Sequence, residues 1–519
     1  RNFKRTCQRD NAEDYLSTRT QKSTMNSRLN LLRHFPSRVI HLGRGFTTIF
    51  DRSAAANFTK RFVGAVGKVT EATDPGKSSE LLRRLVKTKL VSYTDMSENP
   101  EKFFLAHRLL STMGLGGFGI RFTVQFNLFA GSIVGLGGPE QVKALSALQE
   151  SGELGCFLLT ETQAGVLSGL IVETTATWDQ EAQQFVLHTP SDSAAKNWIS
   201  QGLTAEHGVV IADLLIKGKS YGPHPFLMRL RHSSSSSSAD SGDAQSDTHG
   251  ELGKLVRGVT VSDMGHKTVA NDLDNARVWF DHVQLPHDSL LNKFAFVDPA
   301  DGTYHTREGK PAMRIEVIGQ RLLTGRQAIA EAALLSSKCL HLKTEEYAKQ
   351  KKCNGLAGEV SLSSLPHIAN VFEDSYKELD CMLSFAASVE RRLNAVLVSD
   401  GAIPDADLVD AIAVLKVKSV EVSVARSHAL RLEVGSYALM HGTGFELADM
   451  LLTCKFAEGD SRILLLKLAR DRLKRVGKDG LAKTALLALG LAGKVGEGAE
   501  ARAALALALK LSPVKGKGA

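Results

Sequence analysis

The stretch Gly155-Cys-Phe-Leu-Leu-Thr-Glu161 decides how the middle of this chain folds. Alternating, β-branched runs follow it at Glu173-Thr-Thr-Ala-Thr-Trp-Asp179, Phe185-Val-Leu-His-Thr-Pro190 and Lys196-Asn-Trp-Ile-Ser200. Runs of this kind, separated by short polar breaks, are typical of β-strands. Such an arrangement can bring a threonine hydroxyl, a few backbone N–H groups and a tryptophan indole to one flat, redox-active ring.

The composition is that of an ordinary globular protein with a large core. The chain has 519 residues, of which 43% are hydrophobic and 23% are charged, and this length favours two to four domains or one large multi-lobed unit. The six cysteines are scattered without a Cys-x-x-Cys pair, which indicates free thiols rather than a disulfide framework or a metal site. No stretch approaches the roughly 18 to 20 apolar residues of a membrane helix, so we expect no membrane span.

The net charge of +8 does not indicate a nucleic-acid partner, because the excess of basic residues lies near the two ends of the chain. A nucleic-acid-binding face would need basic residues clustered on folded elements and interleaved with aromatic ones. Residues 25–50 contain four arginines and no acidic residue, as mitochondrial presequences do. We therefore expect no nucleic acid as a partner, and we predict a targeting-like leader.

The spacing of apolar residues changes along the chain, and these changes predict its domain organisation. Apolar residues at three- and four-residue spacing indicate helices, and three long patterns over roughly 314–349, 363–398 and 407–440 suit an antiparallel bundle. We predict five regions: a basic leader over 1–50, an N-terminal helical domain over 51–150, a β-domain over 151–295 with a disordered Ser-rich insert at about 232–252, a C-terminal helical bundle over 310–476, and an Ala/Leu-rich tail over 477–519.

The stretches quoted above closely resemble the acyl-CoA oxidases, which are flavin-dependent relatives of the acyl-CoA dehydrogenases. The order Gly-Cys-Phe-x-Leu-Thr-Glu, Glu-Thr-Thr-Ala-Thr-x-Asp and Lys-x-Trp is specific to that family. Arg121-Phe-Thr-Val-Gln-Phe-Asn-Leu-Phe129 and Asp274-Asn-Ala-Arg-Val-Trp-Phe-Asp281 also resemble oxidase segments. The resemblance runs from about Lys89 to Arg470, and it implies that the further helical domain of full-length oxidases is missing or replaced here.

The resemblance implies an α+β multi-domain fold like that of the acyl-CoA dehydrogenases: an N-terminal helical lobe, a central β-barrel or sandwich, and a C-terminal helical bundle. It also implies an FAD-dependent acyl-CoA oxidase that converts a fatty acyl-CoA to trans-2-enoyl-CoA and reduces molecular oxygen to hydrogen peroxide in fatty acid β-oxidation. A homodimer in the peroxisome is expected from the family, with the mitochondrion as the alternative that the Arg-rich leader favours.

The catalytic base that the resemblance implies is Glu458. The family places a glutamate before a glycine and an acidic residue, followed by an apolar run that ends in Ala-Arg. This chain has Phe456-Ala-Glu458-Gly-Asp-Ser461 and then Ala469-Arg470, which align without a gap. A glutamate in an apolar pocket has a raised pKa and is a stronger base for the weakly acidic α-proton of a thioester. The alternative is that Glu458 and Asp460 are first-turn carboxylates favoured by a helix dipole.

Three further residues match positions that contact the flavin in the family. Thr160 would place its hydroxyl near the pyrimidine edge of the ring, although a strand threonine with a cross-strand bond is the alternative. Trp198 matches the second tryptophan of the oxidase Lys-Trp-Trp motif, and it could instead be a core residue. Ser200 stands where oxidases have a flavin-contacting glycine.

Several segments depart from the family pattern. Thr162-Gln-Ala-Gly-Val-Leu-Ser168 and Gly435-Ser-Tyr-Ala438 have lost glycines that permit close approach to a cofactor. The segment that reaches flavin phosphates through arginines is here Lys343-Thr-Glu-Glu-Tyr-Ala-Lys-Gln-Lys351, and lysine lacks the bidentate fork of arginine. These departures keep open the alternative of a catalytically inactive oxidase-like binding or assembly subunit. An acyl-CoA dehydrogenase is a second alternative, because reaction with oxygen depends on solvent access to the flavin. The run Gly114-Leu-Gly-Gly-Phe-Gly119 is not expected to be a dinucleotide site, because no strand is predicted before it.

Overall fold

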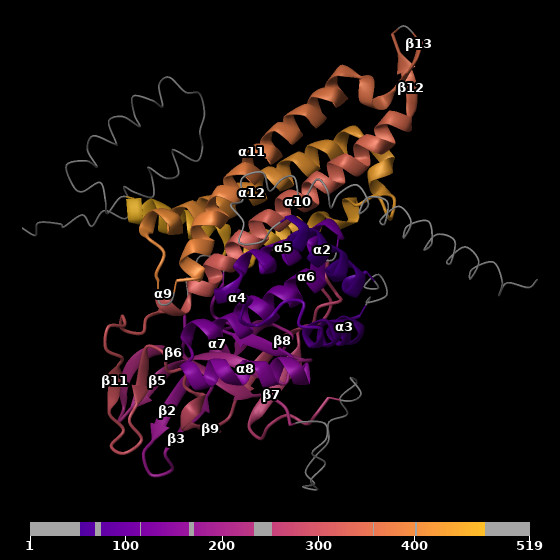
Figure 1. Ribbon diagram of the computed structural model, residues 1–519. Coiled ribbons are helices and arrows are strands. Elements are labelled where there is room, and N and C mark those ends of the chain that lie inside the picture. Colours follow the sequence, from indigo (N-terminus) through magenta and orange to yellow (C-terminus); the bar gives the residue numbers. More distant parts are fainter. Residues whose placement is uncertain are drawn as a thin grey trace, which may run out of the picture.

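The structure of the protein is a computed structural model in which helices and sheets form separate layers (Figure 1). The residues that it describes are 52–67, 74–114, 116–165, 171–232, 252–356, 358–399 and 402–472. The predicted leader, nearly all of the Ser-rich insert and the predicted Ala/Leu-rich tail lie outside these residues. The predicted domain boundaries stay a prediction. Among the described helices, none combines the length and the apolar character that crossing a bilayer requires.

The N-terminal part of the chain forms a lobe of short helices. These are α2 (Arg52–Val66), α3 (Pro75–Lys87), α4 (Asp95–Glu98), α5 (Pro100–Thr112), α6 (Gly116–Thr123), α7 (Gly131–Leu136) and α8 (Pro139–Ser151), with a π-helical segment η2 (Val124–Ala130) between α6 and α7. Stacked and edge-on phenylalanine rings fill the lobe, and the Phe122 ring lies 5.7 Å from that of Phe103 and 4.6 Å from that of Phe126. Asp74 caps α3 by accepting a hydrogen bond from the backbone N–H of Lys77 at 3.0 Å.

Below this lobe in Figure 1 lie the β-strands. They are β1 (Gly155–Leu158), β2 (Thr175–Asp179), β3 (Gln184–His188), β4 (Lys196–Ser200), β5 (His207–Ile216), β6 (Lys219–Arg229), β7 (Val259–Asp263), β8 (Asn275–Phe280), β9 (Val283–Pro286), β10 (Ala295–Val297) and β11 (Tyr304–Thr306). A six-stranded sheet has the order β1-β5-β2-β3-β9, with β6 also paired to β5. A three-stranded sheet has the order β4-β8-β7, and β10 and β11 form a ribbon.

The burial of the strands explains their sequences. β5 is central in the larger sheet, and its residues from Val209 to Ala212 are all fully buried, so both faces of this strand are apolar. β3 pairs with β2 and β9 and alternates instead, with Phe185 and Leu187 pointing into the core and Val186 only partly buried. The alternation of apolar and polar residues in the sequence of β3 therefore reflects a strand with one buried face.

The C-terminal part is a bundle of long helices, drawn in salmon, orange and yellow at the top of Figure 1. Its elements are α9 (Ile315–Ile318), α10 (Gln320–Gln350), the hairpin β12 (Lys352–Gly355) and β13 (Gly358–Ser361), α11 (Pro366–Leu397), α12 (Ala406–Glu433), α13 (Ala448–Phe456) and a helical segment over 461–472. Buried residues of α10 recur at alternating spacings of three and four, which is the pattern of a helix packed along its length in a bundle: Leu323, Gln327, Ala330, Leu334, Ser337, His341, Thr344 and Ala348.

The third long helix ends earlier than the sequence pattern predicts. The pattern continued to residue 440, whereas α12 ends at Glu433 and is followed by a 3-10 turn, η6 (Gly435–Leu439). Gly435 adopts a left-handed backbone with φ of +61°, which a helix cannot continue through and which is a common helix stop. The apolar spacing beyond it reflects the packing of the turn, in which Ala438 is buried.

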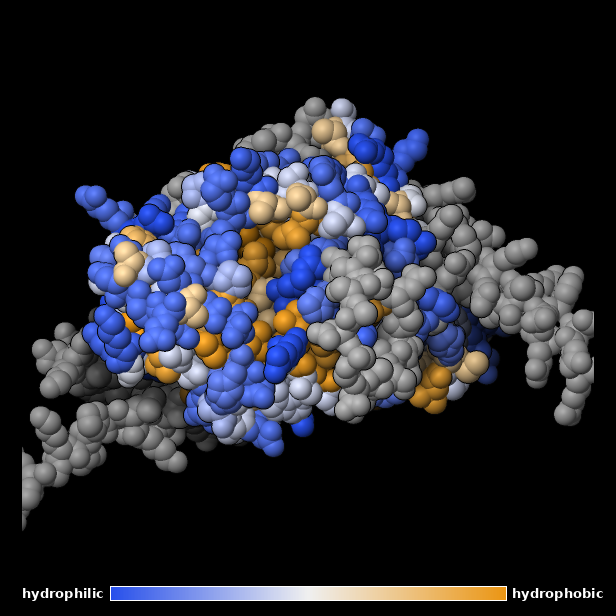
Figure 2. Space-filling model, turned by 90° about the horizontal axis from the view of Figure 1, so that it is seen from below, coloured by the Kyte–Doolittle hydropathy of each residue, from blue (hydrophilic) through white to orange (hydrophobic). Residues whose placement is uncertain are grey.

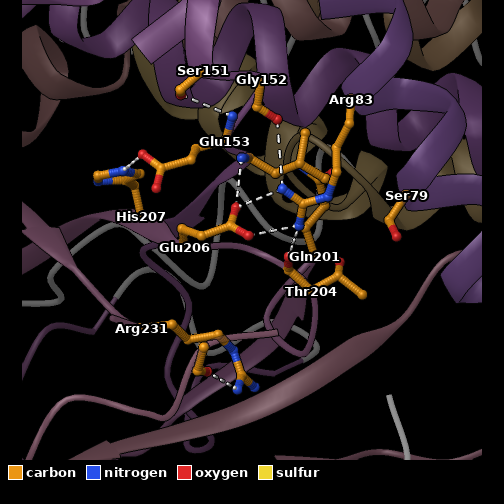
Figure 3. A network of polar contacts seen from close by, with 12 residues as sticks. Ser79, Arg83, Ser151, Gly152, Glu153, Gln201, Thr204, Glu206, His207 and Arg231 are labelled. Atoms are coloured by element: carbon orange, nitrogen blue, oxygen red, sulfur yellow. Dashed lines mark hydrogen bonds and ion pairs between the residues drawn. The ribbon is translucent and has the colours of Figure 1, made fainter. Parts of the chain in front are cut away.

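A polar network attaches the helical lobe to the strands (Figure 3). Arg83 of α3 forms an ion pair with Glu206 at 2.8 Å and donates to the backbone oxygen of Thr204 at 2.7 Å. Glu206 also accepts the backbone N–H of Leu154 at 2.8 Å, immediately before β1. The start of β1 and the start of β5 are therefore both fixed to α3 through one carboxylate.

Candidate active site

Glu458 lies in a tight turn between α13 and the helical segment over 461–472. Its backbone is left-handed, with φ of +56°, and Gly459 after it has φ of +97°. A left-handed conformation is uncommon for a residue with a side chain, and such strain persists where the surrounding structure enforces it. Arg326 of α10 contacts this turn directly, because its Nε donates to the backbone oxygen of Glu458 at 2.8 Å.

The carboxyl group of Glu458 lies directly on the backbone of α10. A Cβ atom at Gly325 would stand only 2.3 Å from Cδ, 2.4 Å from Oε1 and 2.6 Å from Oε2 of Glu458. Only a residue without a side chain permits this approach. The residue as a whole is half-buried, but Oε2 is shielded from solvent and has no hydrogen-bond partner within the described part of the chain. The carboxyl group therefore has an oxygen available to accept a proton.

Burial raises the pKa of Glu458 to about 7, and the nearby cations Arg326 and Lys416 oppose this rise only in part. Lys416 makes no hydrogen bond to the carboxylate, since its Nζ donates to the backbone oxygens of Lys455 and Gly459, both at 2.8 Å, and to Ser461. Burial also lowers the pKa of Lys416 to about 8. The carboxyl group is thus close to half-ionised near neutral pH, as a general base requires.

The three residues predicted at the flavin lie together on the β side of the molecule. Thr160 follows β1, and its backbone oxygen accepts the N–H of Asn197 at 2.8 Å, next to Trp198. Asn275, the first residue of β8, donates from Nδ2 to Ser200 Oγ at 3.1 Å and to the backbone oxygen of Trp198 at 3.5 Å. One side-chain amide therefore holds the backbone of Trp198 and the hydroxyl of Ser200 in a fixed relation.

Trp198 is presented to solvent by an irregularity in its strand. The register between β4 and β8 shifts between Lys196 and Ile199, and Trp198 at this bulge has φ of +59°. Its side chain is 56% exposed, whereas Trp178 is only 6% exposed in the core. Bulges re-aim side chains and are frequent beside functional sites, so the core alternative for Trp198 is wrong.

A buried ion pair that the sequence analysis did not assign fixes the strand of Trp198. Lys196 Nζ lies 2.9 Å from Glu161 Oε1, both side chains have no exposed surface, and Lys196 also donates to the backbone oxygen of Ile211 at 2.7 Å. The other carboxylate contacts of Glu161 are the backbone N–H groups of Glu173 and Thr174. All of these residues except Ile211 belong to the stretches of sequence quoted first. The sequence therefore contained the residues of this ion pair, but nothing in it showed that they pair.

Close packing at the start of α6 connects the bundle to the strands. A Cβ atom at Gly116 would lie 2.6 Å from the sulfur of Met450 on α13, and one at Gly117 would lie 1.9 Å from Asp272, three residues before β8. Within the described residues, no hydrogen bond or ion pair links Glu458 to Thr160, Trp198 or Ser200. The structure therefore brings three predicted site residues together and places Glu458 on the bundle, with α6 in contact with both sides. Gly116 and Gly117, which lie in the run set aside as a false dinucleotide motif, make this contact.

One segment that departs from the family pattern has a local structural role. Lys343, which was predicted near the flavin phosphates, donates to the backbone oxygen of Gly442, and Lys349 forms an ion pair with Glu345 at 2.8 Å within α10. The loop over Thr162–Ser168 is described only as far as Gly165. The weakened phosphate contacts stay a prediction.

The architecture defines the class: this is an α+β protein with the acyl-CoA dehydrogenase fold. Acyl-CoA oxidase 1 from Yarrowia lipolytica is similar with a TM-score of 0.67 and 21% identity, covering 92% of this chain and 67% of that one. A glutaryl-CoA dehydrogenase from Mycobacterium smegmatis in complex with FADH2 is similar with a TM-score of 0.60 and 19% identity, covering 81% of this chain and 94% of that one.

The sequence is similar to acyl-CoA oxidases over about half of the chain. An acyl-coenzyme A oxidase-like protein from Mus musculus is 32% identical over 250 residues, which are 48% of this chain and 36% of the relative. Peroxisomal acyl-coenzyme A oxidase 2 from Arabidopsis thaliana is 32% identical over 250 residues, which are 46% and 33% of the two chains. No family model matches. The chain spans about a third of the length of these relatives. The predicted fold class and the resemblance to acyl-CoA oxidases are confirmed.

Proposed function

We propose that this chain is an FAD-dependent acyl-CoA oxidase that converts a fatty acyl-CoA to trans-2-enoyl-CoA. The observation that carries the proposal is the carboxyl group of Glu458, which has a strained backbone, a shielded oxygen without a hydrogen bond and a pKa raised to about 7 by burial. A structural carboxylate would normally be paired, because leaving a buried polar atom without a partner costs about 1–3 kcal/mol.

The residues of the chain fit the task that this reaction sets. Glu458 would take the proton from Cα of the acyl group as the double bond forms and the hydride leaves Cβ. A base with a pKa near the working pH combines an ionised fraction with sufficient basicity. A bound FAD would supply the hydride acceptor, and its reoxidation by oxygen, with one further proton, would release hydrogen peroxide.

The β side would hold the flavin. The exposed indole of Trp198 offers a flat apolar surface, and Thr160 and Ser200 offer polar groups on segments fixed to it. Figure 2 shows hydrophobic residues lining a hollow in the face of the molecule seen from the strand end, with hydrophilic residues around it. Such a hollow suits a flat ring or an acyl chain. The names of the relatives support the peroxisome as the compartment and fatty acid β-oxidation as the process, with the mitochondrion as the alternative, and we propose a homodimer.

The test starts with the visible absorbance of flavin in the purified protein, followed by peroxide release on adding acyl-CoA. Glu458→Gln keeps the shape of the side chain and removes the base, so we expect turnover to fall by about 100-fold or more while flavin stays bound. Protein that binds no flavin would support the inactive subunit. Turnover with an artificial electron acceptor but without peroxide would support the dehydrogenase. Unchanged turnover in Glu458→Gln would remove this residue from the mechanism.

A further inference from the structure

A second cluster of ligating side chains lies away from Glu458, at the edge of the β-strands. It consists of His188, the last residue of β3, and of Asp281 and His282, which connect β8 to β9. Each offers one ligand atom, and the three atoms lie within 4.8 Å of one another. The cluster joins the two sheets, because β3 and β9 belong to the six-stranded sheet and β8 to the three-stranded one.

The backbone holds these three residues in place. Thr189, next to His188, donates its N–H to the oxygen of Phe280 at 2.8 Å, and Phe280 donates its N–H to Thr189 Oγ1 at 3.0 Å. Asp281 donates its N–H to the oxygen of Gly258 at 2.8 Å. Both ligand-bearing segments are thus fixed to each other by hydrogen bonds, so ordering them for a ligand costs little entropy.

One nitrogen of the cluster has no hydrogen bond. His188 Nδ1 is shielded from solvent, has no hydrogen-bond partner in the described residues, and lies 4.0 Å from Asp281 Oδ1. His282 Nδ1 lies 2.7 Å from the same carboxylate oxygen, and the two imidazole rings are 4.1 Å apart between centroids. A shielded nitrogen without a hydrogen bond, 4.0 Å from a carboxylate oxygen, is consistent with a water or ion bound between them.

We propose that His188, Asp281 and His282 bind one divalent transition-metal ion of the zinc type. Zinc binds histidine nitrogen at about 2.0–2.1 Å and carboxylate oxygen at about 2.0–2.2 Å in a tetrahedron, which sets the ligand atoms roughly 3.4 Å apart. The observed separations of 2.7 Å and 4.0 Å lie on either side of this value, so small side-chain rotations complete the site. Imidazole with carboxylate suits zinc, nickel and copper, whereas magnesium prefers oxygen ligands.

The exposure of the cluster sets the role of the ion. The side chains of Asp281 and His282 are 83% and 67% exposed, so water completes the coordination and the ion exchanges with solution. The ion ties the end of β3 to the β8–β9 connection and stabilises the folded state, because it binds the folded chain and not the unfolded one. It takes no part in the proposed oxidation, since none of its ligands is placed in that site.

Calorimetric titration of the full chain, made without a histidine tag, with zinc chloride tests the proposal. We expect one zinc ion per chain at neutral pH and an upward shift in the melting temperature, with no binding of magnesium. Loss of a group that only hydrogen-bonds to a metal ligand already costs about 10- to 100-fold in affinity. His188→Gln and His282→Asn should therefore each weaken zinc by more than about tenfold, and asparagine accepts the left-handed φ of +50° at residue 282.

His367→Asn is the matched control, because His367 is also exposed and lies 3.9 Å from a carboxylate, Glu433. This variant should bind zinc as the unaltered chain does, and all three variants should keep their acyl-CoA turnover. Absence of zinc binding, or equal binding in His282→Asn and the unaltered chain, would overturn the proposal and leave only a surface hydrogen-bonded cluster.

Discussion

The contact between Gly325 and Glu458 makes a prediction in which stability and activity separate. In Gly325→Ala, the new Cβ would stand 2.3 Å from Cδ of Glu458, whereas carbon atoms in contact are separated by at least about 3.5 Å. The carboxyl group must therefore move by roughly 1.2 Å. It is the far end of a flexible side chain, so it can move without displacing α10.

Alanine is favoured over glycine inside a helix by about 1 kcal/mol, so Gly325→Ala should leave the free energy of unfolding unchanged or slightly higher. A displacement of about 1 Å at a reacting group can cost on the order of 100-fold in rate. We therefore expect peroxide release at saturating acyl-CoA to fall by about 100-fold, with the flavin still bound.

The assay pairs a stopped-time peroxide measurement with chemical unfolding of the same preparation. Gly64→Ala in α2 is the matched control, because a Cβ there would meet nothing within 4 Å. It should show the same gain in stability and no change in turnover. Full activity in Gly325→Ala would show that the position of this carboxyl group does not matter to the reaction and would refute the reasoning.

Three further predictions concern Glu458, Trp198 and Lys196 in turn. First, kcat/KM should rise with pH through about 7, since the pKa of Glu458 is raised to about 7 and only its ionised form can accept a proton. Arg326→Gln removes a cation that lowers this pKa and should therefore move the rise to higher pH, whereas Arg326→Lys should move it less. Identical pH profiles in the two variants would show that the charge of residue 326 does not affect the pKa of Glu458. Second, Trp198→Asn should reduce the flavin retained on purification but leave the melting temperature unchanged. Trp178→Ala in the core should instead cost about 3–5 kcal/mol of stability in chemical unfolding. Equal stability losses in the two variants would mean that Trp198 is structural. Third, Lys196→Met should cost about 3–5 kcal/mol of stability in chemical unfolding, because it leaves Glu161 buried and unpaired. Adding Glu161→Gln should restore part of this stability. A loss in the double variant equal to the sum of the two single losses would contradict the ion pair.

The sequence determined the elements whose patterns are local. The apolar spacing predicted α10, α11 and α12 within a few residues at most ends, because a helix packed on one face repeats its buried positions every three or four residues. The alternation in β3 likewise follows from the single buried face of this strand. Motif order also led to Glu458, since the spacing to Ala469-Arg470 is preserved.

The tertiary structure decided what those residues experience. The sequence could not show that Glu458 rests on Gly325, which is 133 positions earlier in the chain (458 − 325), or that Lys416 is occupied by three other oxygens. It left Trp198 open between core and site, and only the bulge in β4 turned the indole outward. His188 and His282 lie almost a hundred positions apart, and strand pairing alone brings them together. Burial, pKa and ligand geometry depend on neighbours that are distant in sequence, so no local pattern can encode them by itself.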